Sequence, residues 1–325
     1  MHKLTHRFGL TLFVLLSLYF VSRRFNVDNA EEISTKAFIK PFISYAPSFF
    51  TAPDNKLIAC EISKSMSQLT LNLMCLLYNE TQYLADNNSF SDTWATSNRS
   101  CTKEFNFLNP SEVLKIDKNT VRFAFVRDPF RRFVSLYLNK CVNKNECYDC
   151  GSDMRCVVEK IYNSFYDIQN SRNETLKIGH IEAHAAPVTW NCNFHQGIEK
   201  WELLAMGSDT EERVSSAARL ADILRKQGVR GSLVEKIHKN ILSMFLKDLQ
   251  NCGVRFFVAA ETAHSTHKSS NRYEAERQVR EDPFVRGYLH KIYLFDYLVF
   301  PFDRRVLDTA YQKIDSKLFL EEVAK

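Results

Sequence analysis

Hydrophobic and polar positions along the chain predict short strands that alternate with helices. Short apolar runs of strand length stand at 57–62, 121–126, 200–206 and 254–260. Apolar residues at helical spacing follow at 68–78, from Phe130 onward, over 211–227 and over 232–252, and two further helices are expected near the C-terminus. Strands that alternate with helices predict an α/β fold with a central, mainly parallel sheet. In such sheets, ligands bind beyond the carboxyl ends of the strands.

An apolar run over 8–22 predicts a membrane segment ahead of this fold. Basic residues flank it on both sides, and no small-residue cleavage site follows it. The run is short for the ~20 residues of a spanning helix, so a cleaved signal peptide and a buried helix are the alternatives. We expect a single uncleaved transmembrane helix, because some membranes are thin enough for a short span. This divides the chain into a cytoplasmic tail (1–7), the anchor (8–22), a lumenal stem (23–55) and a lumenal domain (56–325).

Glycosylation sequons agree with a lumenal domain. The four Asn-x-Ser/Thr sites are Asn79, Asn87, Asn98 and Asn173. Three of them fall in a polar stretch after residue 78, which we expect to be a surface loop.

Nine cysteines are many for a cytosolic chain of this length. Four of them cluster after a predicted helix: Cys141, Cys147, Cys150 and Cys156. In an oxidising lumen they predict two local disulfides, although Cys147-x-x-Cys150 also has the spacing of zinc ligands. The odd count leaves at least one thiol unpaired within the chain, and we expect Cys60, in a predicted buried strand, to be unpaired.

Composition excludes some functions without identifying one. The chain is 45% hydrophobic, which is too apolar for a disordered protein, and its net charge is a mild +5. Only 9 of 325 residues are glycine, and none lies between Gly9 and Gly151. The first half therefore lacks both the glycine-patterned P-loop and the G-x-G-x-x-G dinucleotide loop. A nucleotide site there must hold its phosphates by other means.

Two loops at predicted strand ends carry anion-binding groups. The loop 63–67 offers Lys64, three serine hydroxyls and the free N–H groups of a helix start, which favour a phosphate. An ordinary helix cap with a surface lysine is the alternative. The second loop begins at Arg127, whose planar guanidinium can bind a phosphate through two hydrogen bonds, and Ser135 follows on the next helix. Asp128 is expected to cap that helix, and the pair at 131–132 to lie on a solvated face.

Residues 125–137 resemble the 3′-phosphate-binding motif of the Golgi carbohydrate sulfotransferases, in the branch of the chondroitin and dermatan 4-O-sulfotransferases. Residues 60–68 are similar to the 5′-phosphosulfate loop of that family. A weaker likeness extends over 57–300 and includes His184-x-x-Pro187, with Cys192 downstream, and Tyr293-x-x-Asp296-Tyr297. This chain departs from the family where Met66 replaces a frequent glycine, where Gln68 replaces a frequent Ser or Thr, and where Arg131 replaces a commonly acidic residue.

The resemblance implies a P-loop-like nucleotide-binding sulfotransferase fold and a type II Golgi membrane protein. It implies an enzyme that transfers sulfate from 3′-phosphoadenosine 5′-phosphosulfate to a glycan hydroxyl without a metal. The 5′-phosphosulfate would be bound by Lys64, Ser65, Met66, Ser67 and Gln68, and the 3′-phosphate by Arg127 and Ser135. Lys64 would also neutralise charge on the leaving oxygen, because transfer of this kind depends on positioning and charge stabilisation.

His184 is the candidate base that takes the proton of the attacking hydroxyl, because imidazole titrates near neutral pH. His180 is the second candidate, and a core or substrate-orienting role for His184 is the alternative.

The expected acceptor is chondroitin, at the 4-hydroxyl of N-acetylgalactosamine. Another glycan acceptor and a non-catalytic lumenal glycan-binding relative are the alternatives, the latter because Met66 and Gln68 depart from the family pattern. A basic stripe can guide such a polyanion or form a solvated helix face. Its members are Arg225, Lys226, Arg230, Lys236 and Lys239. The lumenal signals argue against a nucleic-acid partner, and nothing indicates the oligomeric state.

Overall fold

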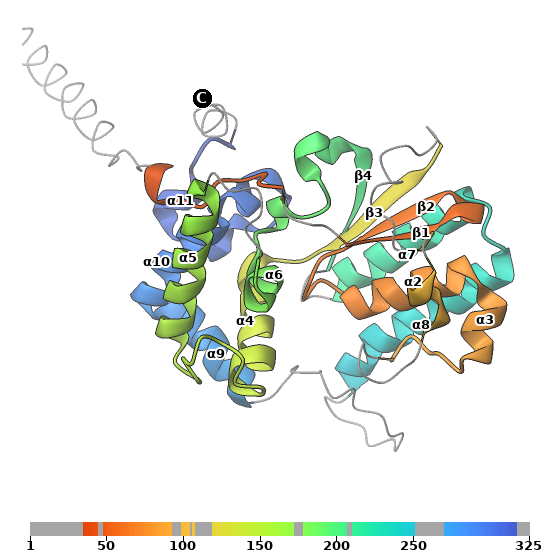
Figure 1. Cartoon of the computed structure of the whole chain (residues 1–325), viewed down its shortest axis with the longest axis horizontal. Coiled ribbons are helices and arrows are strands. Elements are labelled where there is room, and N and C mark those ends of the chain that lie inside the picture. The colour runs from red at the N-terminus through yellow and green to blue at the C-terminus, as the bar shows by residue number, and fades with distance from the viewer. Residues whose placement is uncertain are drawn as a thin grey trace, which may run out of the picture. The chain divides into compact units, whose positions relative to one another are not determined.

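The computed structural model describes residues 35–44, 48–92, 99–104, 106–107, 119–171, 178–206, 210–250 and 270–316 (Figure 1). The chain divides into two compact units, Met1–Ala37 and Phe38–Lys325. Of the first unit only the 3-10 helix η1 (Thr35–Ala37) is described, and the described strands and α-helices belong to the second. The predicted anchor lies outside the described residues. Within them, every helix is too short or too polar to cross a bilayer.

A mixed sheet forms the centre of the second unit. Its described strands are β1 (Ser48–Ala52), β2 (Leu57–Glu61), β3 (Val121–Val126) and β4 (Trp201–Ala205), in the order β1-β2-β3-β4. β1 pairs antiparallel with β2, whereas β2, β3 and β4 are parallel. The prediction of a mainly parallel central sheet is therefore confirmed. β1 lies within the segment predicted as the stem, so the sheet begins before residue 56, and the strand expected at 254–260 lies outside the described residues.

Strand alternation gives the sheet two buried faces. Leu57 and Ala59 of β2 face a core cluster that includes residues of α2, α7 and α8. Ile58 and Cys60 face a second cluster that includes Val188 and neighbouring residues. Figure 1 shows α4, α5, α9 and α10 as a separate group of helices beside the sheet.

The described α-helices agree with the predicted periodicity in the central part of the chain. They are α2 (Ser67–Tyr78), α3 (Glu80–Ala85), α4 (Pro129–Leu136), α5 (Met154–Asn170), α6 (His180–Ala185), α7 (Thr210–Lys226), α8 (Gly231–Gln250), α9 (Ser270–Glu281), α10 (Pro283–Val299) and α11 (Thr309–Gln312). Short 3-10 helices are η2 (Pro53–Asn55), η3 (Ser100–Lys103), η6 (Val188–Trp190), η7 (Phe194–Gln196), η8 (Ile198–Lys200) and η9 (Arg304–Val306), and η5 (Tyr137–Val142) is a π-helix. The stretch after residue 78, expected to be a loop, contains α3.

Four disulfides hold the second unit together, and one of them corrects a prediction. The clustered cysteines form two local bridges, as predicted, and are not zinc ligands. Their pairing, which the sequence leaves open, is Cys141–Cys147 and Cys150–Cys156. The other two bridges are Cys75–Cys101 and Cys60–Cys192. The prediction that Cys60 is unpaired is wrong, because β2 and the segment after Pro187 pack together on the second face of the sheet. The ninth cysteine, Cys252, lies outside the described residues.

Candidate functional site

The loop between β2 and α2 turns through two residues in the left-handed backbone region. Lys64 has φ 64° and Met66 has φ 59°. Met66 is the N-cap of α2, where its left-handed conformation costs about 1–2 kcal/mol relative to glycine. Met66 therefore adopts the left-handed backbone conformation that a glycine normally adopts in such a turn. The loop thus keeps the backbone turn expected from the family resemblance, although Met66 replaces the frequent glycine.

This loop contains polar groups that fit an anion. Ser65 is 1% exposed, and its hydroxyl has no hydrogen-bond partner within the described residues. The side-chain oxygen of Gln68, in the first turn of α2, is also buried and has no hydrogen-bond partner within the described residues. Since buried polar groups are normally paired, the Ser65 hydroxyl is a candidate ligand for the 5′-phosphosulfate.

Lys64 is partly buried beside other cations. Its Nζ donates a hydrogen bond of 2.6 Å to Oδ1 of Asn139 on η5. Burial, followed by the charges of Lys140, Lys144 and Arg127, lowers the pKa of Lys64 to about 8. A bound anion would relieve this repulsion, so the lysine is placed where negative charge is favoured.

Arg127 joins the two predicted loops into one site. It directly follows β3, and its Nη1 donates to the backbone oxygen of Lys64 at 3.4 Å. Burial, followed by the charges of Arg272, Arg213 and Arg131 in that order, lowers the pKa of Arg127 to about 9. Arg213 on α7 and Arg272 on α9 are both buried. Sequence reasoning missed both, because a single arginine in an amphipathic helix does not stand out before the fold is known.

Ser135 is the least well supported of the predicted phosphate ligands. It lies partly buried near the end of α4, eight residues after Arg127. The structure records no hydrogen bond between its hydroxyl and Arg127, within the residues that it describes. Its assignment therefore stays a prediction.

Asp128 and Arg132 have structural roles around this site. Asp128 caps α4 by accepting from the backbone N–H of Arg131 at 2.9 Å, as predicted. Arg132, expected on a solvated face, is 2% exposed. Its guanidinium donates to the backbone oxygen of Ser63 at 3.2 Å and to that of Ala186 at 3.1 Å through both terminal nitrogens. Arg132 thus ties the loop between β2 and α2 to the end of α6.

The Tyr-x-x-Asp-Tyr motif on α10 contacts both the start of α4 and the segment around the end of α6. Tyr293 donates to the backbone oxygen of Ala185 at 2.7 Å, and Tyr297 donates to Asp128 at 2.7 Å. Asp296 accepts from the backbone N–H groups that follow Pro187, at 2.7 and 2.9 Å. The weak Tyr-x-x-Asp-Tyr likeness is therefore a set of positioning contacts rather than a group of ligands.

His184 lies on α6 with its ring near Lys64. Its Nδ1 is 2.8 Å from the backbone oxygen of His180, and the two histidine rings are 4.3 Å apart between centroids. A carbonyl oxygen only accepts, so Nδ1 carries the proton and Nε2 keeps a free lone pair. Burial lowers the pKa of His184 to about 3, and nearby Lys64, His180 and Lys140 contribute to this. His184 is therefore neutral at physiological pH.

Glu61 is a second titratable group that sequence reasoning missed. It is the last residue of β2, three positions before Lys64. Burial raises the pKa of its carboxyl to about 7. A charged residue at the end of an otherwise apolar strand is the signal that marks it, and a pKa near 7 suits proton transfer.

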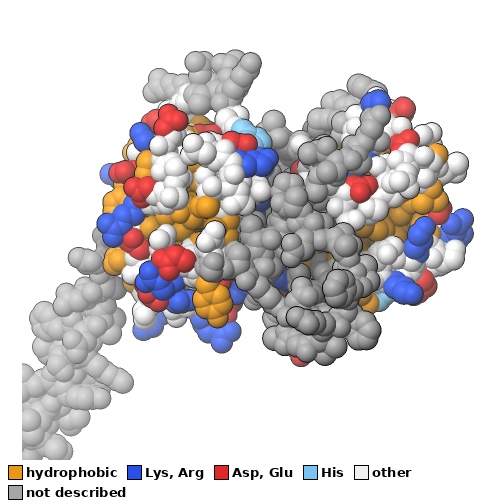
Figure 2. Space-filling model, turned by 90° about the horizontal axis from the view of Figure 1, so that it is seen from below, with side chains coloured by type: hydrophobic (Ala, Val, Ile, Leu, Met, Phe, Trp, Pro, Cys, Tyr) orange, Lys and Arg blue, Asp and Glu red, His pale blue; other side chains and the backbone are white. Residues whose placement is uncertain are grey.

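Other predicted surface features have mixed outcomes. Arg225 pairs with Asp222 and Glu235, and Arg230 pairs with Glu80, so part of the basic stripe is neutralised. On the face shown in Figure 2, basic and acidic side chains are interspersed.

Two of the four sequons are described. Asn79 and Asn87 are both exposed, whereas the other two lie outside the described residues.

Within the described residues no group of three or more His, Cys, Asp or Glu side chains is arranged to hold a metal ion.

Comparison with known proteins establishes the family. Residues 47–303 match the sulfotransferase family, and the chain belongs to it. The chain is similar to two proteins of Caenorhabditis elegans. One is named Carbohydrate sulfotransferase chst-1 and is 27% identical over 290 residues, which cover 86% of this chain and 82% of that protein. The other is named Putative sulfotransferase vep-2 and is 28% identical over 212 residues, which cover 61% of this chain and 64% of that protein. No solved structure matches the chain.

Proposed function

We propose that this sulfotransferase acts on carbohydrate, transferring sulfate from 3′-phosphoadenosine 5′-phosphosulfate to a hydroxyl of chondroitin, at the 4-position of N-acetylgalactosamine. The observation that carries the proposal is the hydrogen bond from Arg127 to the backbone oxygen of Lys64. This bond brings two candidate anion-binding loops together, as a nucleotide with both a 3′-phosphate and a 5′-phosphosulfate requires. Similarity to a protein named as a carbohydrate sulfotransferase supports a sugar acceptor.

The residues around this contact fit the donor nucleotide. The donor supplies an activated sulfuryl group when it is bound. Lys64, the unpartnered Ser65 hydroxyl and the helix start at Ser67 would hold its 5′-phosphosulfate, with the Met66 backbone and Gln68 at the edge of that loop. Arg127 and Ser135 would hold its 3′-phosphate. Lys64 would stabilise the charge that develops on the leaving oxygen.

His184 would accept the proton of the attacking hydroxyl at Nε2. Its contact with the His180 oxygen fixes the tautomer that leaves Nε2 able to accept. Negative charge bound at Lys64 offsets one of the charges that lower the pKa of His184, so its basicity rises when the donor is present. Glu61 is the competing base.

Sulfate transfer by the purified lumenal part of the chain tests this proposal. Labelled donor should sulfate desulfated chondroitin, and a panel of other glycans would reveal a different acceptor. Binding of adenosine 3′,5′-bisphosphate without transfer to any glycan would indicate the non-catalytic alternative. Absence of both binding and transfer would contradict the proposal altogether.

The base is tested by comparing His184→Ala with Glu61→Gln. General base catalysis contributes roughly 10²–10⁴-fold, so the variant that lacks the base should lose at least about 100-fold in kcat. Both variants should still bind adenosine 3′,5′-bisphosphate. Full activity of His184→Ala would transfer the role to Glu61 or to another group.

A type II Golgi membrane location, with an anchor at 8–22 and N-linked glycans on the domain, is part of the same proposal. The sequons at Asn79 and Asn87 are exposed, which modification requires. Expression of the full chain in cultured cells, followed by treatment with an N-glycosidase, should increase its electrophoretic mobility. Unchanged mobility would contradict the lumenal assignment.

A further inference from the structure

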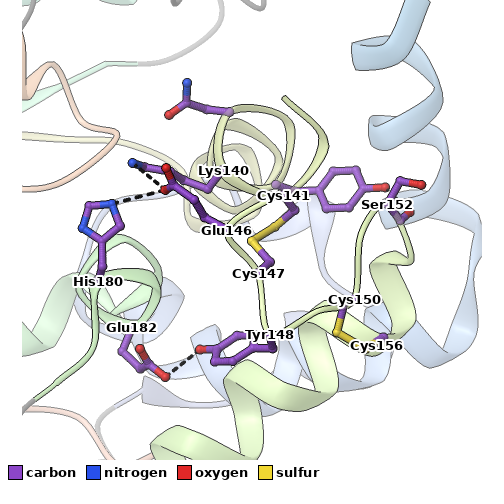
Figure 3. Close-up of a disulfide and its surroundings, with 12 residues drawn as sticks. Lys140, Cys141, Glu146, Cys147, Tyr148, Cys150, Ser152, Cys156, His180 and Glu182 are labelled. Atoms are coloured by element: carbon purple, nitrogen blue, oxygen red, sulfur yellow. Dashed lines mark hydrogen bonds and ion pairs between the residues drawn. A yellow bond between two sulfur atoms is a disulfide. The ribbon is translucent and has the colours of Figure 1, made fainter. Parts of the chain in front are cut away.

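A disulfide-closed loop beside Lys64 contains none of the residues assigned above to the donor nucleotide. The 139–147 loop begins in the π-helix η5 and is closed by the Cys141–Cys147 bridge (Figure 3). π-helical turns occur frequently at functional sites. Asn139 of this loop accepts the hydrogen bond from Lys64 Nζ, so loop and lysine are in direct contact.

The loop carries an excess of positive charge around one carboxylate. Lys140 Nζ is 3.1 Å from Oε2 of Glu146, and His180 Nε2 is 3.6 Å from the same oxygen. Lys144 Nζ is 4.0 Å from the other oxygen, Oε1. Figure 3 shows His180 and Lys140 both directed at Glu146. The Glu146 side chain is 39% exposed and that of Lys144 is 44% exposed, so a ligand from solvent can reach both.

The same charges act on the groups that would carry out transfer. After burial, Lys140 and Lys144 are the largest causes of the lowered pKa of Lys64. Burial is also the main cause of the lowered pKa of His184, and Lys140 contributes to it. Coulomb interactions weaken with distance, so Lys140 lies near both Lys64 and His184. Because Asn139 of the 139–147 loop contacts Lys64, this loop flanks the place where an acceptor sugar would meet the donor.

The loop is held rigidly by several contacts. The backbone N–H of Glu146 donates to the oxygen of Lys140 at 2.9 Å. Just beyond the loop, Tyr148 donates to Glu182 of α6 at 2.6 Å, and Tyr137 of η5 donates to the backbone oxygen of Ser152 at 2.6 Å. A preorganised binding surface loses little entropy when a ligand binds.

Building on the proposed function, we propose that Lys140, Lys144 and His180 bind a carboxylate of the acceptor glycan in the position that Glu146 now occupies. Glu146 shows that this position accepts a carboxylate, and its exposure allows it to be displaced. A uronate next to the sulfated sugar supplies such a group, so the loop selects uronate-containing chains over neutral ones.

Two matched acceptors and three variants test this inference. The acceptors are desulfated chondroitin and carboxyl-reduced chondroitin, which have the same backbone with and without carboxylates. Lys144→Ala should lower kcat/KM on chondroitin about 5- to 10-fold and change it less than twofold on the reduced chain, since a partly exposed ion pair with the uronate is lost. Glu146→Gln should act in the opposite direction and lower KM for chondroitin alone. Lys313→Ala, which removes an exposed lysine just after α11 and outside the basic stripe, should change neither.

Equal effects of Lys144→Ala on both acceptors, or a loss of activity on chondroitin in Lys313→Ala as large as that in Lys144→Ala, would overturn the inference. If the wild type sulfates neither acceptor but binds adenosine 3′,5′-bisphosphate, chondroitin is not the substrate and the loop is tested by binding alone. Retention of the wild type on immobilised chondroitin should then exceed retention on the reduced chain, and Lys144→Ala should abolish the difference. Equal retention of the wild type on both would refute the carboxylate site itself.

Discussion

The lowered pKa of Lys64 predicts that nucleotide binding weakens in mild alkali. In the free protein, burial and the charges of Lys140, Lys144 and Arg127 lower this pKa to about 8. The charged form therefore predominates below pH 8 and is lost as pH rises through it. A lysine with an ordinary pKa near 10.4 would stay charged well above that range.

The size of the effect follows from the fraction of charged lysine. With a pKa of about 8, roughly nine-tenths of Lys64 is charged at pH 7 and roughly one-tenth at pH 9. If only the ammonium form binds the 5′-phosphate well, affinity falls about tenfold between these values. By linkage, binding at pH 8.5 should also take up about three-quarters of a proton.

Titration calorimetry with adenosine 3′,5′-bisphosphate measures both quantities. Buffers of different ionisation enthalpy give the proton uptake, and a range above pH 7 avoids titration of the phosphates themselves. Lys64→Arg is the matched control, because an arginine stays charged to much higher pH. If the affinity of Lys64→Arg still declines near pH 9, the decline indicates deprotonation of Arg127, whose pKa is lowered to about 9. Constant wild-type affinity from pH 7 to 9.5 would refute the reasoning.

Three further substitutions test the framework of the site. Met66→Gly should be more stable to denaturant than Met66→Ala by about 1 kcal/mol, because both lose the methionine side chain and only glycine accepts a φ of 59° without strain; equal stabilities would contradict this. Replacing Cys60 and Cys192 together with alanine should lower the free energy of unfolding by about 2–5 kcal/mol, and no change would deny the bridge a stabilising role. Arg132→Met should cost about 2–4 kcal/mol and weaken bisphosphate binding, because it leaves the Ser63 and Ala186 oxygens without their donor; unchanged nucleotide affinity would show that Arg132 does not position the loop.

Local signals predicted the parts of the fold that depend on neighbours in sequence. β3 and α4 follow from an apolar run that ends at Arg127-Asp128-Pro129, because aspartate caps a helix and proline suits its first turn. Two local disulfides follow from the clustering of four cysteines between residues 141 and 156, although the sequence leaves their pairing open. The loop with Lys64 was found because its residue types suit a phosphate.

Features that depend on distant segments were missed. The partner of Cys60 is 132 residues away, and only the packing of the second sheet face brings it near. Arg132 looks like a surface residue by type, yet the fold buries it against two backbone oxygens. Arg213 and Arg272 come from separate helices and act on the same guanidinium, that of Arg127. No spacing rule in the sequence connects such positions.

The most direct test of the central claim compares two ligands on two proteins. Adenosine 3′,5′-bisphosphate and adenosine 5′-monophosphate differ only in the 3′-phosphate, which the account assigns to Arg127. The wild type should bind the bisphosphate roughly 10- to 100-fold more tightly, as expected for charge-assisted hydrogen bonds of about 1.5–3 kcal/mol. Arg127→Ala should lose most of this preference while its affinity for the monophosphate changes little. An undiminished preference in Arg127→Ala would contradict the claim that the two loops form one nucleotide site.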